Sequence, residues 1–274
     1  MYARPVNGHP SMTHVAITGA AGNVGSVAVD AFEESAHDLT LFTHSETDDV
    51  ESTVLDVTER EAFVERLPSD ADVLVHLAAN PSPYADWDAV SEVNVDGVYN
   101  AYHAAVENDL SRVVYASSNH AVNADAVADP TEPETTSDDA PVTDPDSDHA
   151  PDSYYGVTKV AGEAMGKFYA HRHGLEVVNL RIGWLMSDDQ LRETVDDPPS
   201  SEYDEAAVRF ARAMWLSPRD CRDAVRQAVT ADLPATPVTA HAISENADRI
   251  LSLAETRRAL GYDPQDDAAR VLDD

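Results

Sequence analysis

A strand, a glycine-rich turn and a helix follow one another near the start of the chain. Residues 14–18 (His-Val-Ala-Ile-Thr) read as a short buried strand, and a helical pattern follows the turn as far as Phe32. Gly19, Gly22 and Gly25 allow the backbone to turn tightly and to bring N–H groups at the helix N-terminus close to a pyrophosphate. This arrangement predicts a dinucleotide-binding unit at the start of a parallel sheet.

Strands and helices continue to alternate after this unit. Further strands are expected at residues 39–42, 53–56, 72–77, 112–115 and 176–181, with helices between them. Such alternation is typical of a doubly wound parallel sheet, so we predict an α/β fold of Rossmann type. The alternation weakens later, and we expect residues 12–182 to form the dinucleotide-binding domain and residues 183–274 a small substrate-binding lobe.

Tyr155 and Lys159 form the feature that points most directly to chemistry. The chain contains only two lysines, and one of them follows a tyrosine by four residues. Residues four apart on a helix share a face, so both side chains should point into one cleft. A fixed ammonium favours the phenolate and lowers the tyrosine pKa, which makes Tyr155 a candidate general base toward an alcohol. The alternative is a surface pair on an amphipathic helix.

The glycine turn and the Tyr-Lys pair together resemble the extended short-chain dehydrogenases/reductases, over nearly the whole chain. The resemblance implies a catalytic set of Ser118, Tyr155 and Lys159, with Asn94 supporting the proton relay and Asp56 meeting the adenine. The implied cofactor-binding residues are Gly19, Gly22, Asn23, Val24, Gly25, Thr43, His44, Ser45, Asp56, Val57, Leu77, Ala78, Ala79, Asn94, Tyr155, Lys159 and Ile182.

Longer strings resemble one branch of that family. Residues 116–120 and 180–183 are similar to uronate dehydrogenases, and residues 213–217 and 260–264 to haloarchaeal relatives that oxidise glucose 6-phosphate or pentoses at the anomeric carbon. The resemblance implies oxidation of a cyclic aldose to its lactone. The implied substrate-binding residues are Ser82, Ser118, Asn119, His120, Trp184, Arg209 and Arg212, whereas Trp215 and Tyr262 within these strings could instead be ordinary core aromatics.

The sequence differs from this branch at one residue that is expected to lie near the substrate. Trp184 stands where uronate-specific relatives carry a serine, which disfavours a uronate. We therefore expect a neutral aldose such as L-arabinose or a related hexose. Glucose 6-phosphate comes second, if Arg209, Arg212 and Arg219 face the cleft rather than form a solvated helix face.

The choice of cofactor depends on the end of the second strand. NAD-selective relatives carry an acidic residue there that binds the ribose 2′-hydroxyl. This chain has Thr43, His44 and Ser45 instead, and their side chains can accommodate a 2′-phosphate. NADP is therefore slightly favoured over NAD, unless Glu46 supplies the ribose contact.

Charge and cysteine content restrict the partners. Acidic residues outnumber basic ones 51 to 18, for a net charge of −33, so nucleic acids and anionic membranes should be repelled. Molar salt screens such charges beyond about 3 Å, and we interpret the acidic surface as an adaptation to strong brine rather than as a metal site. Cys221 is the single cysteine, which predicts a cytoplasmic protein without an internal disulfide. We also expect a homo-oligomer, and either a disordered arm over residues 1–11 or a translation start at Met12.

Residues 124–152, here called the acidic segment, differ from their surroundings. They contain eight Asp, two Glu and five Pro with few bulky apolar side chains, and such a stretch cannot bury enough surface to order itself. The segment lies at the rim of the expected site, and we favour a solvated insertion over a lid. A similar run at residues 188–205 predicts another exposed loop.

Two other functions remain open. A nucleotide-sugar epimerase or dehydratase belongs to the same family, but it usually has a larger C-terminal lobe, and dehydratases carry acids where this chain has Asn119 and His120. The other is a non-catalytic dinucleotide sensor. The intact set of Ser118, Tyr155 and Lys159 argues against a sensor.

Overall fold

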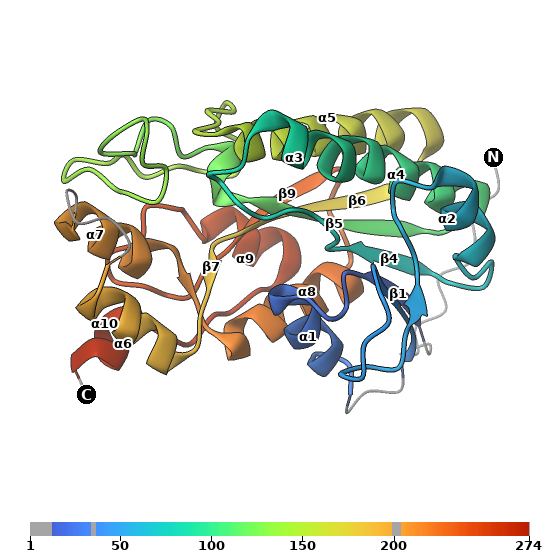
Figure 1. Ribbon diagram of the computed structural model, residues 1–274, viewed down its shortest axis with the longest axis horizontal. Coiled ribbons are helices and arrows are strands. Elements are labelled where there is room, and N and C mark those ends of the chain that lie inside the picture. The colour runs from blue at the N-terminus through green and yellow to red at the C-terminus, as the bar shows by residue number, and fades with distance from the viewer. Residues whose placement is uncertain (1–12, 34–36, 199–203, 274) are drawn as a thin grey trace.

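The computed structural model describes residues 13–33, 37–198 and 204–273, so residues 1–11 and Met12 lie outside the described part. Its centre is a seven-stranded parallel sheet in the order β3-β2-β1-β4-β5-β6-β9 (Figure 1). The order changes direction between β1 and β4, which is where doubly wound sheets bind their ligands. The bounds are β1 His14–Thr18, β2 Asp38–Thr43, β3 Thr53–Val54, β4 Val73–His76, β5 Arg112–Ser118, β6 Glu176–Ile182 and β9 Val238–Ala242. The predicted α/β fold is confirmed.

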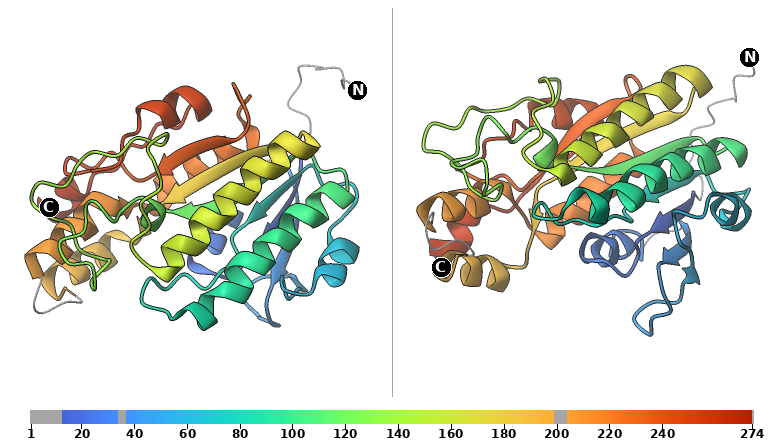
Figure 2. Two further views of the ribbon diagram at one scale, coloured as in Figure 1. Left: turned by 90° about the horizontal axis from the view of Figure 1, so that it is seen from above. Right: turned by 45° about the horizontal axis from the view of Figure 1, so that its top comes forward.

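Helices cover both faces of the sheet (Figures 1 and 2). On one face α4 (Gly97–Glu107) packs between α5 (Tyr154–His173) and α2 (Arg60–Arg66). On the other face α1 (Asn23–Asp30) packs against α8 (Pro218–Thr230). The sheet is therefore closed to water on both sides, and its carboxyl edge is left for a ligand.

The strands bury side chains on both faces, as an internal parallel sheet requires. Along β1, Val15 and Ile17 join the core that contains residues of α1 and α8, whereas Ala16 joins the core that contains residues of α4. This alternation follows from the two-residue period of a strand. Both cores hold the sheet and thus position the residues at the strand ends.

Smaller elements lie at one end of the molecule. The helices α6, α7 and α10 pack together there, beside the short parallel pair of β7 and β8 (Figure 1). The remaining bounds are α3 Trp87–Ser91, a π-helical turn Glu92–Asp96, a 3-10 turn Asn119–Ala121, β7 Trp184–Leu185, α6 Asp188–Asp196, α7 Asp204–Met214, β8 Trp215–Leu216, α9 Ala254–Leu260 and α10 Ala268–Asp273.

The chain after residue 183 contributes both to the central sheet with its covering helices and to the group of smaller elements at one end of the molecule. Its strand β9 pairs with β6, and its helix α8 covers the sheet, so these two elements extend the dinucleotide-binding fold. The group of α6, α7 and α10 corresponds better to the expected lobe. The boundary between residues 182 and 183 stays a prediction.

The prediction of an exposed loop at residues 188–205 was wrong for the first half of that range. A helix, α6, occupies residues 188–196, and its N-terminus is closed by a capping box between Ser187 and Gln190. Acidic residues in a first helical turn are stabilised by the helix dipole, so the acidic run favours the helix start. Leu191 is fully buried and anchors the helix.

The acidic segment is held in place by contacts with the rest of the chain, although it contains no helix or strand beyond isolated bridges. Thr135 and Thr136 are buried, and the backbone of Thr143 exchanges hydrogen bonds with Ile250 and Ser252. The prediction that this segment cannot order itself was wrong, because backbone hydrogen bonds to distant residues replace the missing apolar contacts. The segment forms the long connection before α5 in Figure 1.

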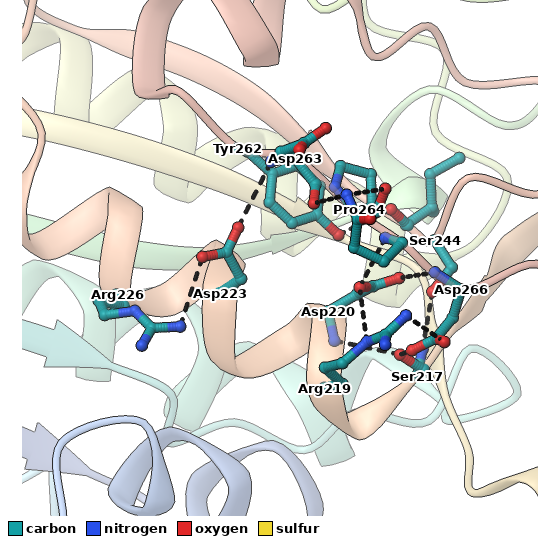
Figure 3. A network of polar contacts seen from close by, with 12 residues as sticks. Ser217, Arg219, Asp220, Asp223, Arg226, Ser244, Tyr262, Asp263, Pro264 and Asp266 are labelled. Carbon is teal, nitrogen blue, oxygen red and sulfur yellow. Dashed lines mark hydrogen bonds and ion pairs between the residues drawn. The ribbon is translucent and has the colours of Figure 1, made fainter. Parts of the chain in front are cut away.

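A polar network fixes the end of the chain to the start of α8 (Figure 3). The buried Asp220 accepts hydrogen bonds from the backbone N–H groups of Gln265 and Asp266, at 2.9 and 3.0 Å. Tyr262 is fully buried and its hydroxyl donates to the carbonyl of Ile243 at 2.8 Å. Trp215 is fully buried as well, so both aromatics of the two longer strings are core residues.

The described residues add three negative observations. None of their helices is both long and apolar enough to cross a membrane. They contain no group of three or more His, Cys, Asp or Glu side chains that could hold a metal ion. Cys221 is buried, and it forms no disulfide within the described residues.

Candidate active site

A cavity of about 330 Å³ opens at the carboxyl edge of the sheet, across β1, β4, β5 and β6. It brings together most of the residues expected to bind cofactor or substrate. The predicted residues that line it are Gly19, Gly22, Asn23, Val24, Gly25, Leu77, Ala79, Ser118, Asn119, His120, Tyr155, Lys159, Ile182 and Trp184. The sequence motifs therefore meet in one place.

The glycine turn forms one wall of the cavity. Gly19 has φ +71°, and a side chain there would lie 2.9 Å from the backbone nitrogen of Ala78. A side chain at Gly25 would overlap the carbonyl oxygen of Gly19. Gly22 precedes the first residue of α1 and has no side chain to cap the helix, so backbone N–H groups there are open to a ligand. This cradle fits a pyrophosphate.

Ser118, Tyr155 and Lys159 meet across the cavity from that turn. Ser118 ends β5, and Tyr155 lies in the first turn of α5, whose start is fixed by Ser153 accepting a hydrogen bond from the Gly156 N–H at 3.1 Å. Lys159, one turn later, places Nζ 5.3 Å from the Tyr155 ring centroid. All three side chains are buried.

Burial sets the protonation of this pair. It raises the pKa of Tyr155 to about 12, although a hydrogen bond with Ser118 acts in the opposite direction. It also lowers the pKa of Lys159 to about 7. The expected lowering of the tyrosine pKa is not present in the chain alone, because Lys159 lies against the ring and donates to the carbonyl of Ala116 at 2.7 Å. An additional positive charge would be needed to favour the phenolate.

Asn94, in the π-helical turn, is buried between the loop after β4 and helix α5. Its side chain accepts from the Asn80 N–H at 2.8 Å, and its amide donates to the Asn80 carbonyl at 3.0 Å and to Thr158 Oγ1 at 3.2 Å. These contacts tie the loop after β4 to α5. The role of Asn94 in supporting a proton relay stays a prediction.

Several predicted cofactor residues do not line the cavity, and all of them except Asn94 lie at or just after a neighbouring strand end. Thr43 donates to the carbonyl of Ser45 at 2.9 Å. Asp56 accepts from the N–H and the hydroxyl of Thr58, which lowers the pKa of Asp56. The members of this group are Thr43, His44, Ser45, Asp56, Val57, Ala78 and Asn94, and their contacts with a cofactor stay predictions.

Asn119 and His120 face the cavity directly after Ser118. The Asn119 amide nitrogen is buried and has no hydrogen-bond partner among the described residues, which leaves a donor for a ligand. His120 Nδ1 lies 2.8 Å from Asp152, a buried carboxylate that also accepts from Asn123 and Ser153. A carboxylate oxygen accepts hydrogen bonds, so His120 carries a proton on Nδ1 in this contact.

Three predicted substrate residues do not line the cavity. Arg209 donates to the carbonyl of Thr136 at 2.9 Å and pairs with Asp138, and Arg212 pairs with Asp248 at 2.7 Å. The backbone N–H of Ser82 donates to Asn80. Arg219, the third arginine considered for an anionic sugar, pairs with Asp266 within the polar network in Figure 3. The two predicted arginines are thus engaged outside the cavity.

Glu134 and Phe210 line the cavity and were missed from the sequence. Phe210 packs 5.7 Å from Trp184 between ring centroids and supplies an apolar wall. Its helical spacing with buried Ala206 and Met214 was a usable signal. Glu134 belongs to the acidic segment, where no periodicity distinguishes it from solvated carboxylates.

A second buried network surrounds Glu163 on α5. Glu163, one turn after Lys159 on α5, accepts from Arg181 at 2.8 Å on each carboxylate oxygen and from Ser117 at 2.5 Å. His149 of the acidic segment lies 2.8 Å from the same carboxylate. Burial alone would raise the pKa of Glu163, but these hydrogen bonds outweigh it and lower the value to about 2.

Comparison with known proteins gives several matches. Residues 15–213 match the model described as the NAD dependent epimerase/dehydratase family. L-arabinose 1-dehydrogenase (NAD(P)(+)) of Haloferax volcanii is 50% identical over 96% of this chain and 100% of that protein. NAD-dependent glucose-6-phosphate dehydrogenase of the same organism is 35% identical over 93% of this chain and 94% of that protein. The crystal structure of uronate dehydrogenase from Agrobacterium tumefaciens superposes with a TM-score of 0.73 at 25% identity, covering 94% of this chain and 86% of that one.

Proposed function

Since the chain belongs to the NAD dependent epimerase/dehydratase family, we propose that it oxidises a cyclic aldose at the anomeric hydroxyl to the lactone, with NADP or NAD. The observation that carries this proposal is the meeting of Ser118, Tyr155 and Lys159 with the glycine turn around one cavity. The similarity to L-arabinose 1-dehydrogenase and to NAD-dependent glucose-6-phosphate dehydrogenase supports this proposal.

Each catalytic residue has a separate task in this proposal. Tyr155 takes the proton of the anomeric hydroxyl, and Ser118, which hydrogen-bonds Tyr155, orients the same oxygen. Lys159 keeps the phenolate and the cofactor ribose in place from the wall of the cavity. NADP or NAD, when bound, would supply the hydride acceptor and a positive charge that favours the phenolate.

We propose Gly19, Gly22 and Gly25 as the pyrophosphate cradle, with the neighbouring strand ends of β2 and β3 holding the ribose and adenine. The short side chains of Thr43 and Ser45 leave NADP slightly favoured over NAD. Initial rates with each cofactor test this preference. A strong preference for NAD would contradict it.

For the substrate we propose a neutral aldose such as L-arabinose or a related hexose first, and glucose 6-phosphate second. Trp184 and Phe210 give the cavity an apolar side, and Arg209 and Arg212 are paired elsewhere, which weakens the case for an anionic sugar. A nucleotide-sugar epimerase or dehydratase and a dinucleotide sensor remain the alternatives.

The deciding experiment is a substrate screen in molar KCl with NADP and NAD. Pentoses, hexoses, uronates, sugar phosphates and UDP-sugars are offered in turn, reduced nicotinamide is followed by absorbance, and the product is identified as a lactone. We expect lactone from at least one unphosphorylated aldose. Activity confined to nucleotide sugars, or no turnover of any sugar, would contradict the proposal.

We also propose that the protein acts in the cytoplasm as a homo-oligomer. Exposed aromatic side chains support an association surface where α4 and α5 lie side by side: Tyr99 is 39% exposed and Phe168 58%. Light scattering coupled to size-exclusion chromatography at high salt measures the oligomeric state. A monomer at all protein concentrations would contradict this part of the proposal.

A further inference from the structure

We infer that Glu134 determines specificity in this cavity: its carboxylate accepts hydrogen bonds from sugar hydroxyls and disfavours sugars that carry a carboxylate or a phosphate. The inference rests on the proposed sugar dehydrogenase function and narrows its substrate class. It concerns a residue of the acidic segment that the sequence did not place in the site.

The first support for this inference is the position of Glu134 in the wall of the cavity. It lines the same cavity as Ser118, Tyr155 and His120, which are expected to surround the sugar. The side chain is half-buried, and burial raises its pKa although His120 and a hydrogen bond with Tyr84 act in the opposite direction. The carboxyl group is thus partly withdrawn from solvent at the wall of the cavity.

The basic group that lowers the pKa of Glu134 is His120, whose Nδ1 is already paired with the carboxylate of Asp152. Asp152 and Glu132 both raise the pKa of Glu134 further, so the surroundings are already acidic. Among the described residues that line the cavity, Lys159 is the only lysine or arginine, and its ammonium is bound to the carbonyl of Ala116. An anionic sugar at this wall would meet like charge, which costs binding free energy.

Hydrogen-bonding capacity leads to the same conclusion. Asp152 occupies Nδ1 of His120, so Nε2 is the ring nitrogen left for a ligand. Glu134 is an acceptor, and the buried Asn119 amide is a donor without a partner among the described residues. Sugar hydroxyls donate and accept, and therefore satisfy all three groups. Carboxylates and phosphate dianions only accept, and would leave the Glu134 carboxylate unpaired.

The test compares the wild-type enzyme with Glu134→Gln, which keeps the side-chain shape and removes the charge. The substrates are L-arabinose and the pair glucuronate and glucuronamide, which differ in charge at one position. We expect wild type to favour glucuronamide over glucuronate in kcat/KM by ten-fold or more, and Glu134→Gln to reduce this ratio at least five-fold. Asp146→Asn, at an exposed carboxylate of the same segment outside the cavity wall, is the matched control and should leave the ratio within two-fold.

The outcomes separate the two proposals. If wild type oxidises free aldoses but the ratio is the same in wild type and Glu134→Gln, or wild type favours glucuronate, the assignment of Glu134 is overturned while the function stands. If wild type oxidises no free sugar, the proposed function fails first. The assignment of Glu134 is then judged by calorimetry with glucuronate and glucuronamide in the presence of NADP: a preference for the amide that Glu134→Gln removes supports it, and any other result overturns it. Thermal melts confirm that each variant is folded.

Discussion

The buried carboxylate of Glu163 gives a stability prediction whose size follows from the structure. Its pKa falls from an ordinary 4.5 to about 2, because hydrogen bonds from Arg181, His149 and Ser117 outweigh burial. A difference of this size between folded and unfolded chains corresponds to roughly 3 kcal/mol of stability. Since the folded pKa is depressed, this contribution is complete above pH 4.5 and is lost as the pH falls toward 2.

We expect Glu163→Gln to lower the free energy of unfolding by about 3 kcal/mol at neutral pH, because it leaves the buried guanidinium of Arg181 without its carboxylate. The difference from wild type should shrink as the pH falls below 4.5. Urea unfolding is measured in molar KCl from pH 7 down to the lowest pH at which both proteins are folded. Glu107→Gln, at an exposed glutamate, is the matched control and should change little at any pH.

Two results would refute this reasoning. A loss below about 1 kcal/mol at neutral pH would mean that the ion pair of Glu163 and Arg181 does not stabilise the fold beyond what the neutral amide achieves. A loss that stays constant between neutral pH and the acid limit would mean that the carboxylate is not the titrating group.

Three further predictions concern the site and the surface. Tyr155→Phe should keep the fold and cofactor binding but lower kcat by about two orders of magnitude or more, whereas Tyr154→Phe, at the exposed neighbour, should not; near wild-type turnover in Tyr155→Phe would rule out the proposed base. Gly25→Ala should abolish NADP binding measured by calorimetry, since its side chain would overlap the Gly19 carbonyl; unchanged affinity would show that the turn is not the cradle. The melting temperature should rise between dilute buffer and molar KCl, because salt screens the net charge of −33, and a flat response would refute the screening argument.

The parts of the molecule predicted from sequence are those whose signal is local. The buried strand at residues 14–18 and its glycine turn adjoin in the chain, and Tyr155 and Lys159 are one helical turn apart. The four-residue spacing on a helix fixes their common face without knowledge of the rest of the fold. These features appear in the structure where the sequence placed them.

The parts that sequence reasoning missed depend on contacts between distant residues. Glu134 is one of many acidic residues in its segment, and only the packing of that segment near Tyr84 and His120 brings it to the cavity. Arg209 was a candidate for the substrate because it lies near the string around Trp215, but Thr136 and Asp138 bind its guanidinium. Neither partner is identifiable from spacing along the chain.

The attachment of the acidic segment has a consequence for how this enzyme can diverge. The segment leaves the main fold after the 3-10 turn at Asn119–Ala121 and rejoins it at α5, and between these points it contributes no strand to the central sheet. Replacing its interior should therefore leave the nucleotide cradle and the proton-transfer residues in position while changing the side chains presented to the sugar. Substrate preference can thus evolve, or be engineered by loop grafting, separately from the redox machinery. The residues at its anchor points, His149 and Asp152, are the ones that a graft has to keep.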